Sequence, residues 1–404
     1  MQGSSQLAVP RYSRSIFTGR ARPASPLMRV CSLSSVKDRI VLGQPLPFSV
    51  RDASRMLLLA RGQVIGDEAQ LDELFQRGAL VEVDDLAEAI HPGQKVTPAQ
   101  RLARLPADWE RSTQDTRLAL NAPAAQMAAA LNSTTDMLMS LIERSPNIAL
   151  SQVVRQADSN SGHYGVNHSI HAATACQASA SYLGWNAVEQ RRAFQAALTM
   201  NLAMLDLQAR LATQVSPLTV KQRETIQEHP TRSAEMLSQA GITDPDWLES
   251  IRKHHELADG TGYPKGATDI SELADLLRFA DIYTACLSSR SNRPAMSTQH
   301  AGRELHQMAG SSPLAAALIK AFGIFPPGSR VKLASGELGV VVRNGEKAYH
   351  PMVATLTNHA GEPRLTPLMR DTAVDAHRVV ALLSAQAMPM RLTDEQIAGL
   401  IGGG

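Results

Sequence analysis

Four histidines and one aspartate in the middle of this 404-residue chain have the types and spacing of a metal site. His168, His229, His254 and His255 each fall near the expected start or end of a helix, where several elements converge. Asp281 occupies an apolar helical position, where a carboxylate is costly unless a cation or strong hydrogen-bond donors meet it. Imidazoles with one inward carboxylate suit Zn, Mn or Fe better than Ca or Mg. A lone histidine in such a place is more often an ordinary core residue, so the prediction rests on the cluster.

The composition limits the classes of protein to which this chain can belong. An apolar content of 44% and a net charge of +2 exclude a chain that is disordered throughout. No apolar run approaches the roughly 18–20 residues that cross a bilayer, so we expect no membrane span. The cysteines, Cys31, Cys176 and Cys286, form no CxxC pair. This spacing fits neither a disulfide framework nor a thiolate zinc site, and it predicts a cytoplasmic protein.

The basic character of the chain is concentrated at its start. Residues 1–37 contain six basic and no acidic side chains, so the remainder carries a net charge of −4. Such a segment is typical of a targeting presequence, a nucleic-acid-binding arm or a disordered extension, the last with Met28 as an alternative start. We expect a disordered tail, and the acidic remainder argues against nucleic acid as the main partner.

Hydrophobic periodicity predicts a mainly α chain, with a small α/β module before the helices and a small β-rich appendage after them. One helix is expected to begin at Thr219 and to end near His229-Pro230, and another to follow Pro230 and to stop at Gly241. The expected organisation is a disordered basic tail (1–37), a small α/β regulatory module (38–94), a helical linker (95–150), a helical bundle domain (151–325), a β-rich appendage (326–385) and a tail (386–404).

One string of residues indicates which family the helical block resembles. His254-His255-Glu256 is followed by Asp259-Gly260-Thr261-Gly262-Tyr263-Pro264, which gives the pattern HHE-x-x-DGTGYP. It closely resembles the signature of HD-GYP domains, which are HD-domain-type helical bundles and metal-dependent phosphodiesterases that open cyclic di-GMP in bacteria. Further family motifs are matched by His168, Leu218-Thr219 to His229-Pro230, Asp281-Ile282-Tyr283 and Arg290, so that the resemblance covers about residues 160–300.

The resemblance implies a ligand set and a contact surface. His229, His254 and His255 would hold one divalent transition metal (Fe, Mn or Zn), with His168 and Asp281 as further candidates. The same imidazoles could equally be core residues that bind no metal. Metal occupancy is expected to fall below about pH 6, where imidazoles gain protons. Cyclic di-GMP and GGDEF-type signalling proteins are the implied partners, and the implied loop contacts to them are Asp259, Gly260, Gly262, Tyr263 and Pro264. Lys265, Arg290 and Arg293 lie beside this loop and the Asp281 helix in the sequence; they are candidate phosphate contacts or, equally, solvated surface charges.

The chain departs from the family at the residues that give the HD domain its name. Where the family has AAL-x-HDIGK, Met200-Asn201 replaces the His-Asp pair and Ala203-Met204 replaces Gly-Lys. Thr284 replaces the second aspartate of the family's "aDvyDAL" helix. An amide carries no charge and offers one acceptor oxygen, so Asn201 cannot serve as the carboxylate that bridges two metals in the family. Metal-assisted attack on a phosphodiester is weakened accordingly.

The sequence therefore predicts a degenerate HD-GYP protein without catalytic residues, which binds a nucleotide or a protein partner in bacterial cyclic di-GMP signalling. Two alternatives stay open. One is an active cyclic di-GMP phosphodiesterase with an altered metal set, and the other is an adaptor that binds no ligand.

Overall fold

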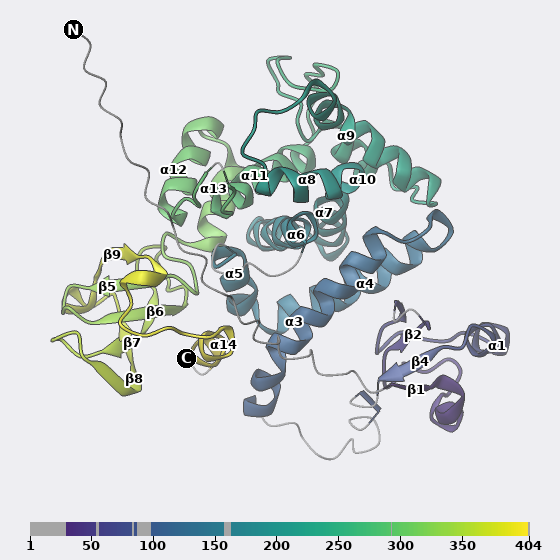
Figure 1. Cartoon of the computed structure of the whole chain (residues 1–404), viewed down its shortest axis with the longest axis horizontal. Helices are drawn as coiled ribbons and strands as arrows, with labels where there is room; N and C mark the ends of the chain where they lie inside the picture. The colour runs from purple at the N-terminus through teal and green to yellow at the C-terminus, as the bar shows by residue number, and fades with distance from the viewer. Residues whose placement is uncertain are drawn as a thin grey trace, which may run out of the picture.

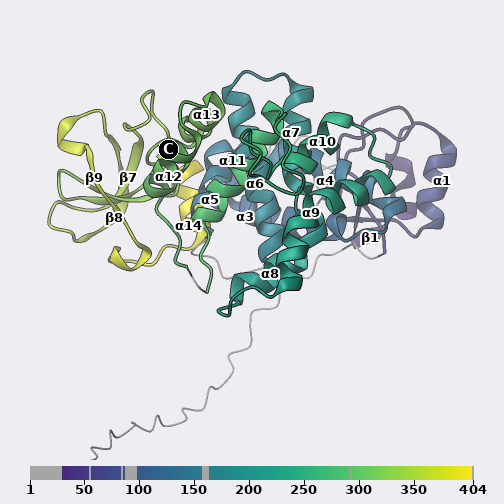
Figure 2. The same cartoon turned by 90° about the horizontal axis from the view of Figure 1, so that it is seen from above.

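The computed structural model describes residues 30–53, 56–82, 85–86, 98–156, 163–291 and 293–402. It is mainly helical, with one small sheet on the N-terminal side of the helices and another on the C-terminal side, which confirms the predicted fold class (Figures 1 and 2). Within these ranges, no helix combines the length and the apolar character that crossing a membrane requires.

The N-terminal sheet belongs to a small α/β module. Its strands are antiparallel in the order β1-β4-β2-β3, namely β1 (Val30–Ser32), β2 (Val50–Arg51), β3 (Leu57–Leu59) and β4 (Leu80–Glu82). Helix α1 (Glu68–Gln76) begins where the Asp67 carboxylate accepts the backbone N–H of Gln70.

The prediction of a disordered tail through residue 37 is wrong for residues 30–37. Strand β1 pairs with β4, and η1 (Leu33–Arg39) follows it directly. Leu33 and Val36 are buried in the apolar core of the module. Burial of these two side chains offsets the entropy of ordering the segment. The rest of the predicted tail, residues 1–29, lies outside the described residues.

The helical domain lies between the two sheets in Figure 1. Its elements are α3 (Pro98–Leu120), α4 (Ala124–Arg144), α5 (Pro146–Val154), α6 (Tyr164–Tyr182), α7 (Ala187–Thr199), η2 (Leu202–Met204), α8 (Leu205–Thr213), α9 (Val220–Gln239), α10 (Pro245–Lys253), α11 (Glu272–Leu287), α12 (Thr298–Ala309) and α13 (Pro313–Phe322). Helix α6 is central and packs against α3, α5, α7, α8, α11 and α13. Its small buried side chains let these neighbours approach closely, and they include Ala172, Ala173, Ala175 and Ala180.

The segment expected as a helical linker packs into the same core as the bundle. Leu120, Leu131 and Leu138 of α3 and α4 belong to one apolar cluster with residues of α6, α7 and α11. Arg51 of β2 forms a buried, two-pronged ion pair with Asp115 of α3, which ties the N-terminal module to these helices. Helices α3 and α4 are therefore part of the domain that holds the histidines.

Helix α9 differs from its prediction at Pro230. The helix was expected to end near His229-Pro230, but it continues to Gln239. Proline removes one backbone donor inside a helix and disfavours it by about 3 kcal/mol, so packing must offset that cost. Pro230 and its neighbours His229, Ser233 and Ala234 are all buried, which supplies the packing.

The C-terminal sheet is antiparallel in the order β8-β7-β6-β5-β9, with β5 (Arg330–Leu333), β6 (Leu338–Arg343), β7 (Met352–Thr357), β8 (Pro363–Asp371) and β9 (Val379–Leu383). The expected tail 386–404 is wrong for most of its length. Helix α14 (Asp394–Gly402) packs against α3, α5 and β6, and it buries Ile397, Ala398 and Ile401.

Candidate functional site

Three of the predicted ligands converge between α9 and the end of α10. The ligand atoms of His229, His254 and His255 all lie within 4.8 Å of one another. His229 and His254 are fully buried, and His255 is half-buried. The structure thus brings together residues that are 25 positions apart in the chain. Three imidazoles of this kind form a donor set that holds one divalent transition metal.

The hydrogen bonds of two of these rings determine which nitrogen is free. Nδ1 of His229 lies 2.5 Å from the carbonyl oxygen of Ile226, and Nδ1 of His254 lies 2.6 Å from that of Ile251. A carbonyl oxygen can only accept, so each Nδ1 must carry the proton. In the neutral ring the lone pair is then on Nε2, and the two Nε2 atoms are 3.3 Å apart. Two lone pairs that face each other repel unless a cation lies between or beside them, so this pair fits a metal.

Burial keeps these imidazoles in the form that can bind a metal. Desolvation lowers the pKa of His229 to about 3, and the neighbouring His254 adds to the shift. Burial likewise lowers the pKa of His254 and lowers that of His255 well below its ordinary value. All three rings are therefore neutral at pH 7.

The loop after α10 places an aromatic ring against His255. The ring of Tyr263 stacks on His255 with centroids 4.6 Å apart, and the N–H of Tyr263 donates to the His255 carbonyl at 3.1 Å. Glu256 is buried and accepts the backbone N–H groups of Lys265 at 2.7 Å and Ala267 at 3.0 Å. Glu256 thus holds the backbone at the end of this loop, at Lys265 and Ala267, in place. The position of Glu256 in the HHE string does not by itself indicate this role.

Two further residues of the predicted contact set shape the same loop. A Cβ on Gly262 would lie 2.4–2.6 Å from backbone atoms of Glu256 and Leu257, so only glycine fits there. The Asp259 carboxylate accepts from the backbone N–H and the hydroxyl of Thr261, at 2.9 and 2.6 Å. The DGTGYP string therefore builds a rigid turn beside the histidines.

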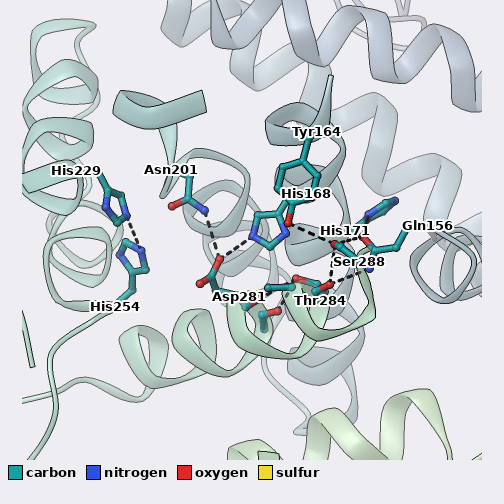
Figure 3. A network of polar contacts seen from close by, with 12 residues as sticks. Gln156, Tyr164, His168, His171, Asn201, His229, His254, Asp281, Thr284 and Ser288 are labelled. Atoms are coloured by element: carbon teal, nitrogen blue, oxygen red, sulfur yellow. Dashed lines mark hydrogen bonds and ion pairs between the residues drawn. The ribbon is translucent and has the colours of Figure 1, made fainter. Parts of the chain in front are cut away.

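Asp281 and His168 form the second half of the candidate site. Nε2 of His168 lies 2.7 Å from Oδ1 of Asp281, and Nδ2 of Asn201 lies 3.4 Å from the same oxygen (Figure 3). Burial alone would raise the pKa of Asp281, but the hydrogen bond and charge of His168, with the nearby imidazoles, hold that pKa well below its usual range. Figure 3 shows Asn201 and Asp281 between His168 on one side and the pair His229 and His254 on the other.

In this half of the site, His168 and Asn201 both contact Oδ1 of Asp281. The replacement residues Met200 and Asn201 are both fully buried. Two atoms here have no hydrogen-bond partner among the described residues, namely Oδ1 of Asn201 and Nδ1 of His168. A metal at Asp281 would have to displace the Asn201 amide N–H, so these residues fit a second ion poorly.

A polar network around Gln156, which the sequence did not predict, lies beside His168 (Figure 3). Gln156 donates to the Thr284 carbonyl at 2.9 Å, and its Oε1 accepts the Ser288 hydroxyl at 3.1 Å and lies 3.0 Å from Nδ1 of His171 (Figure 3). Burial lowers the pKa of His171 to about 3. Thr284, which replaces the family aspartate, donates its hydroxyl to Ala280 within α11.

The three basic residues predicted as contacts, Arg290, Arg293 and Lys265, differ in exposure and in their protein partners. Arg290 donates to the Tyr164 hydroxyl through Nη2 at 2.9 Å and Nε at 3.2 Å, and its guanidinium lies over that ring. Arg293 donates through Nη2 to the Ala285 carbonyl at 2.6 Å. Lys265 is exposed. Both arginines therefore have protein partners in this structure.

A cavity of about 510 Å³ lies among η2, α8 and the start of α9, with Met204 in its wall. Its apolar side includes Met127 and Met236, and its basic residues are Arg210 and Lys221. This volume is within the usual range for small-molecule sites, about 300–1,000 Å³. Nothing in the local sequence around Arg210 or Lys221 indicates a cavity.

Comparison with known proteins agrees with the geometry. Residues 136–314 match the family model described as the HD domain. "Cyclic di-GMP phosphodiesterase PA4108" of Pseudomonas aeruginosa is 28% identical over 272 residues, which cover 66% of this chain and 65% of that protein. "Cyclic di-GMP phosphodiesterase PdeB" of Borreliella burgdorferi is 25% identical over 140 residues, or 34% of this chain and 37% of that protein.

The chain thus spans less than two thirds of the length of either relative. Among solved structures, Bd1817 of Bdellovibrio bacteriovorus, described as an HDG"Y"P protein, shares 17% identity with a TM-score of 0.43. That match covers 72% of this chain and 97% of the other.

Proposed function

We propose that this protein is a cyclic di-GMP signalling protein whose degenerate HD-GYP domain binds a nucleotide or a protein partner and does not hydrolyse cyclic di-GMP. The observation that carries the proposal is the amide of Asn201, which directs a donor at Asp281 from the position where the family has a metal-bridging carboxylate. A donor at this place stabilises the carboxylate without a metal.

The three histidines support one residual metal. His229, His254 and His255 would hold it, and Fe, Mn or Zn suits this donor set. A bound divalent ion supplies positive charge for phosphate and lowers the pKa of water. One ion without the bridging carboxylate lacks the paired charge that clamps both sides of a phosphodiester in two-metal sites.

The cavity beside Met204 supports nucleotide binding. Arg210 and Lys221 contribute positive charge to its wall, which suits phosphate groups. The loop 259–265 with Arg290 and Arg293 is the proposed contact surface for nucleotide or for a GGDEF-type partner. The three cysteines are free, which suits a reducing cytoplasm.

The rival function is an active cyclic di-GMP phosphodiesterase with an altered metal set, which the names of the two relatives and the intact histidine cluster favour. Anaerobic purification, metal analysis and titration with cyclic di-GMP separate the two. We expect at most one ion per chain, saturable nucleotide binding and no pGpG or GMP. Metal-dependent product formation that His255→Ala abolishes would establish the enzyme. A chain that binds neither nucleotide nor a GGDEF-type protein would be the adaptor.

A further inference from the structure

Pro230 lies inside α9, four residues after Ile226. In an α-helix the carbonyl of residue i accepts the backbone N–H of residue i+4. Proline has no N–H, so the carbonyl of Ile226 has no helical donor. A buried carbonyl oxygen without a donor is unfavourable, and another group must supply the hydrogen bond.

The ring of the preceding residue supplies it. Nδ1 of His229 lies 2.5 Å from the Ile226 oxygen, and His229 is fully buried. The bond fixes the proton on Nδ1 and leaves the lone pair on Nε2, the atom that faces His254. A backbone N–H at residue 230 would compete for the same oxygen and would draw it along the helix axis, away from the ring.

His254 obtains the same arrangement in a different way. Helix α10 ends at Lys253, and His254 is its C-cap. The carbonyls of the last helical turn have no helical donor, and that of Ile251 accepts Nδ1–H of His254 at 2.6 Å. The end of α10 thus leaves the Ile251 carbonyl available to His254, as Pro230 leaves the Ile226 carbonyl available to His229.

We infer that Pro230 is a positioning residue for His229: by withholding a backbone donor, it reserves the Ile226 carbonyl for Nδ1–H and presents the Nε2 lone pair to a cation. The inference about the tautomer stands on the hydrogen bonds alone, and its consequence for metal binding rests on the proposed residual metal. Groups that orient a metal-binding imidazole typically change metal affinity by about 10–100-fold when they are lost.

The test is Pro230→Ala in the full chain, with Pro313→Ala as control. Pro313 is at the first turn of α13, where proline withholds no helical bond. Long-range ¹H–¹⁵N spectra of histidine-labelled, metal-free protein report the tautomer of each ring. We expect His229 to be protonated on Nδ1 in the parent and partly on Nε2 in Pro230→Ala, with His254 unchanged as an internal reference.

A second readout separates positioning from a structural role. Removal of a proline from a helix interior should leave the melting temperature equal or higher. We expect Zn²⁺ affinity to fall by about tenfold in Pro230→Ala and to stay unchanged in Pro313→Ala. An unchanged His229 tautomer in Pro230→Ala would overturn the inference. If the parent binds no Zn²⁺ while the tautomer shifts as expected, the residual metal of the proposed function fails and the positioning role of Pro230 stands.

Discussion

Asn201 places its amide Nδ2 3.4 Å from Oδ1 of Asp281, on an oxygen that His168 also contacts at 2.7 Å. Oδ1 of Asp281 therefore has two protein side chains as partners. The three other histidines of the site have no such carboxylate among them and face one another. The half of the site around Asp281 and the half formed by His229, His254 and His255 thus differ in their polar partners.

Asn201→Asp should make the part of the site around Asp281 require a metal ion. The new carboxylate at residue 201 would lie close to that of Asp281, since the amide it replaces is 3.4 Å from Oδ1, and the two negative charges would repel each other. We expect the melting temperature of the metal-free variant to fall by about 3–8 °C at pH 7. Mn²⁺ or Zn²⁺ should restore it, because an ion that binds only the folded state stabilises that state. Thermal unfolding with and without metal measures both effects. Asn201→Ala is the control, since it removes the donor without adding charge. Equal, metal-independent melting of Asn201→Asp and the parent would show that residue 201 does not act on Asp281.

His254→Ala should remove the residual metal. It deletes one of the two Nε2 atoms that are 3.3 Å apart, so we expect the metal content to fall from about one ion per chain toward none. Elemental analysis of the purified variant is the measurement. His306→Ala on α12 is the matched control, because that histidine is exposed. The same metal content in parent and His254→Ala would place the ion elsewhere.

Acid should destabilise the protein through the same rings. The folded pKa of His229 is about 3 against an ordinary value of 6.5, so below pH 6.5 the unfolded chain binds more protons than the folded chain. The stability that this histidine contributes is thus complete above about pH 6.5 and decreases steadily as the pH falls below it. Competition between protons and metal should begin only below the pH 6 expected from the sequence, because burial lowers all three pKa values. Melting between pH 7.5 and 5 should show a shallower loss in His229→Gln, and an equal slope would argue against a neutral, buried His229.

Arg290→Ala should lower stability. Its guanidinium makes two hydrogen bonds to the Tyr164 hydroxyl, and bonds from a charged donor contribute about 1–3 kcal/mol. We expect a fall in melting temperature of about 2–6 °C, with a similar change for Tyr164→Phe. In a double-mutant cycle the two effects should not add, and full additivity would show that the pair does not interact.

Glu337→Gln should weaken the C-terminal sheet at neutral pH. Glu337 is fully buried and accepts both Nε and Nη2 of Arg370, at 3.0 and 2.8 Å, which lowers its pKa from 4.5 to about 2. This lowered pKa contributes up to about 3 kcal/mol of stability above pH 4.5, which is lost as the pH falls from 4.5 toward 2. Acid unfolding of Glu337→Gln should lack this loss, and Glu346→Gln at an exposed position should behave like the parent. The same acid dependence in Glu337→Gln and the parent would exclude this ion pair as its cause.

The sequence by itself determined the elements that depend on neighbouring residues. The small α/β module before the helices and the β-rich appendage after them both follow from local hydrophobic periodicity. The HHE-x-x-DGTGYP string supplied His254 and His255 as metal candidates and the separate stretch Leu218-Thr219 to His229-Pro230 supplied His229; the three side chains lie together in the structure. The loss of the His-Asp pair was likewise visible at Met200-Asn201.

The tertiary structure alone decided features that depend on residues distant in sequence. Thr393 and Gln396 form a local capping pair at the start of residues 394–402, but the packing of α14 depends on the apolar surface that α3, α5 and β6 offer to Ile397 and Ile401. Helix α9 continues through Pro230 because packing on both sides offsets the missing hydrogen bond. The partners of Asp281 come from α6 and from the residues between α7 and η2, about 113 and 80 positions away. Local sequence fixes which groups a residue can offer, and the packing of remote helices decides which of those groups meet.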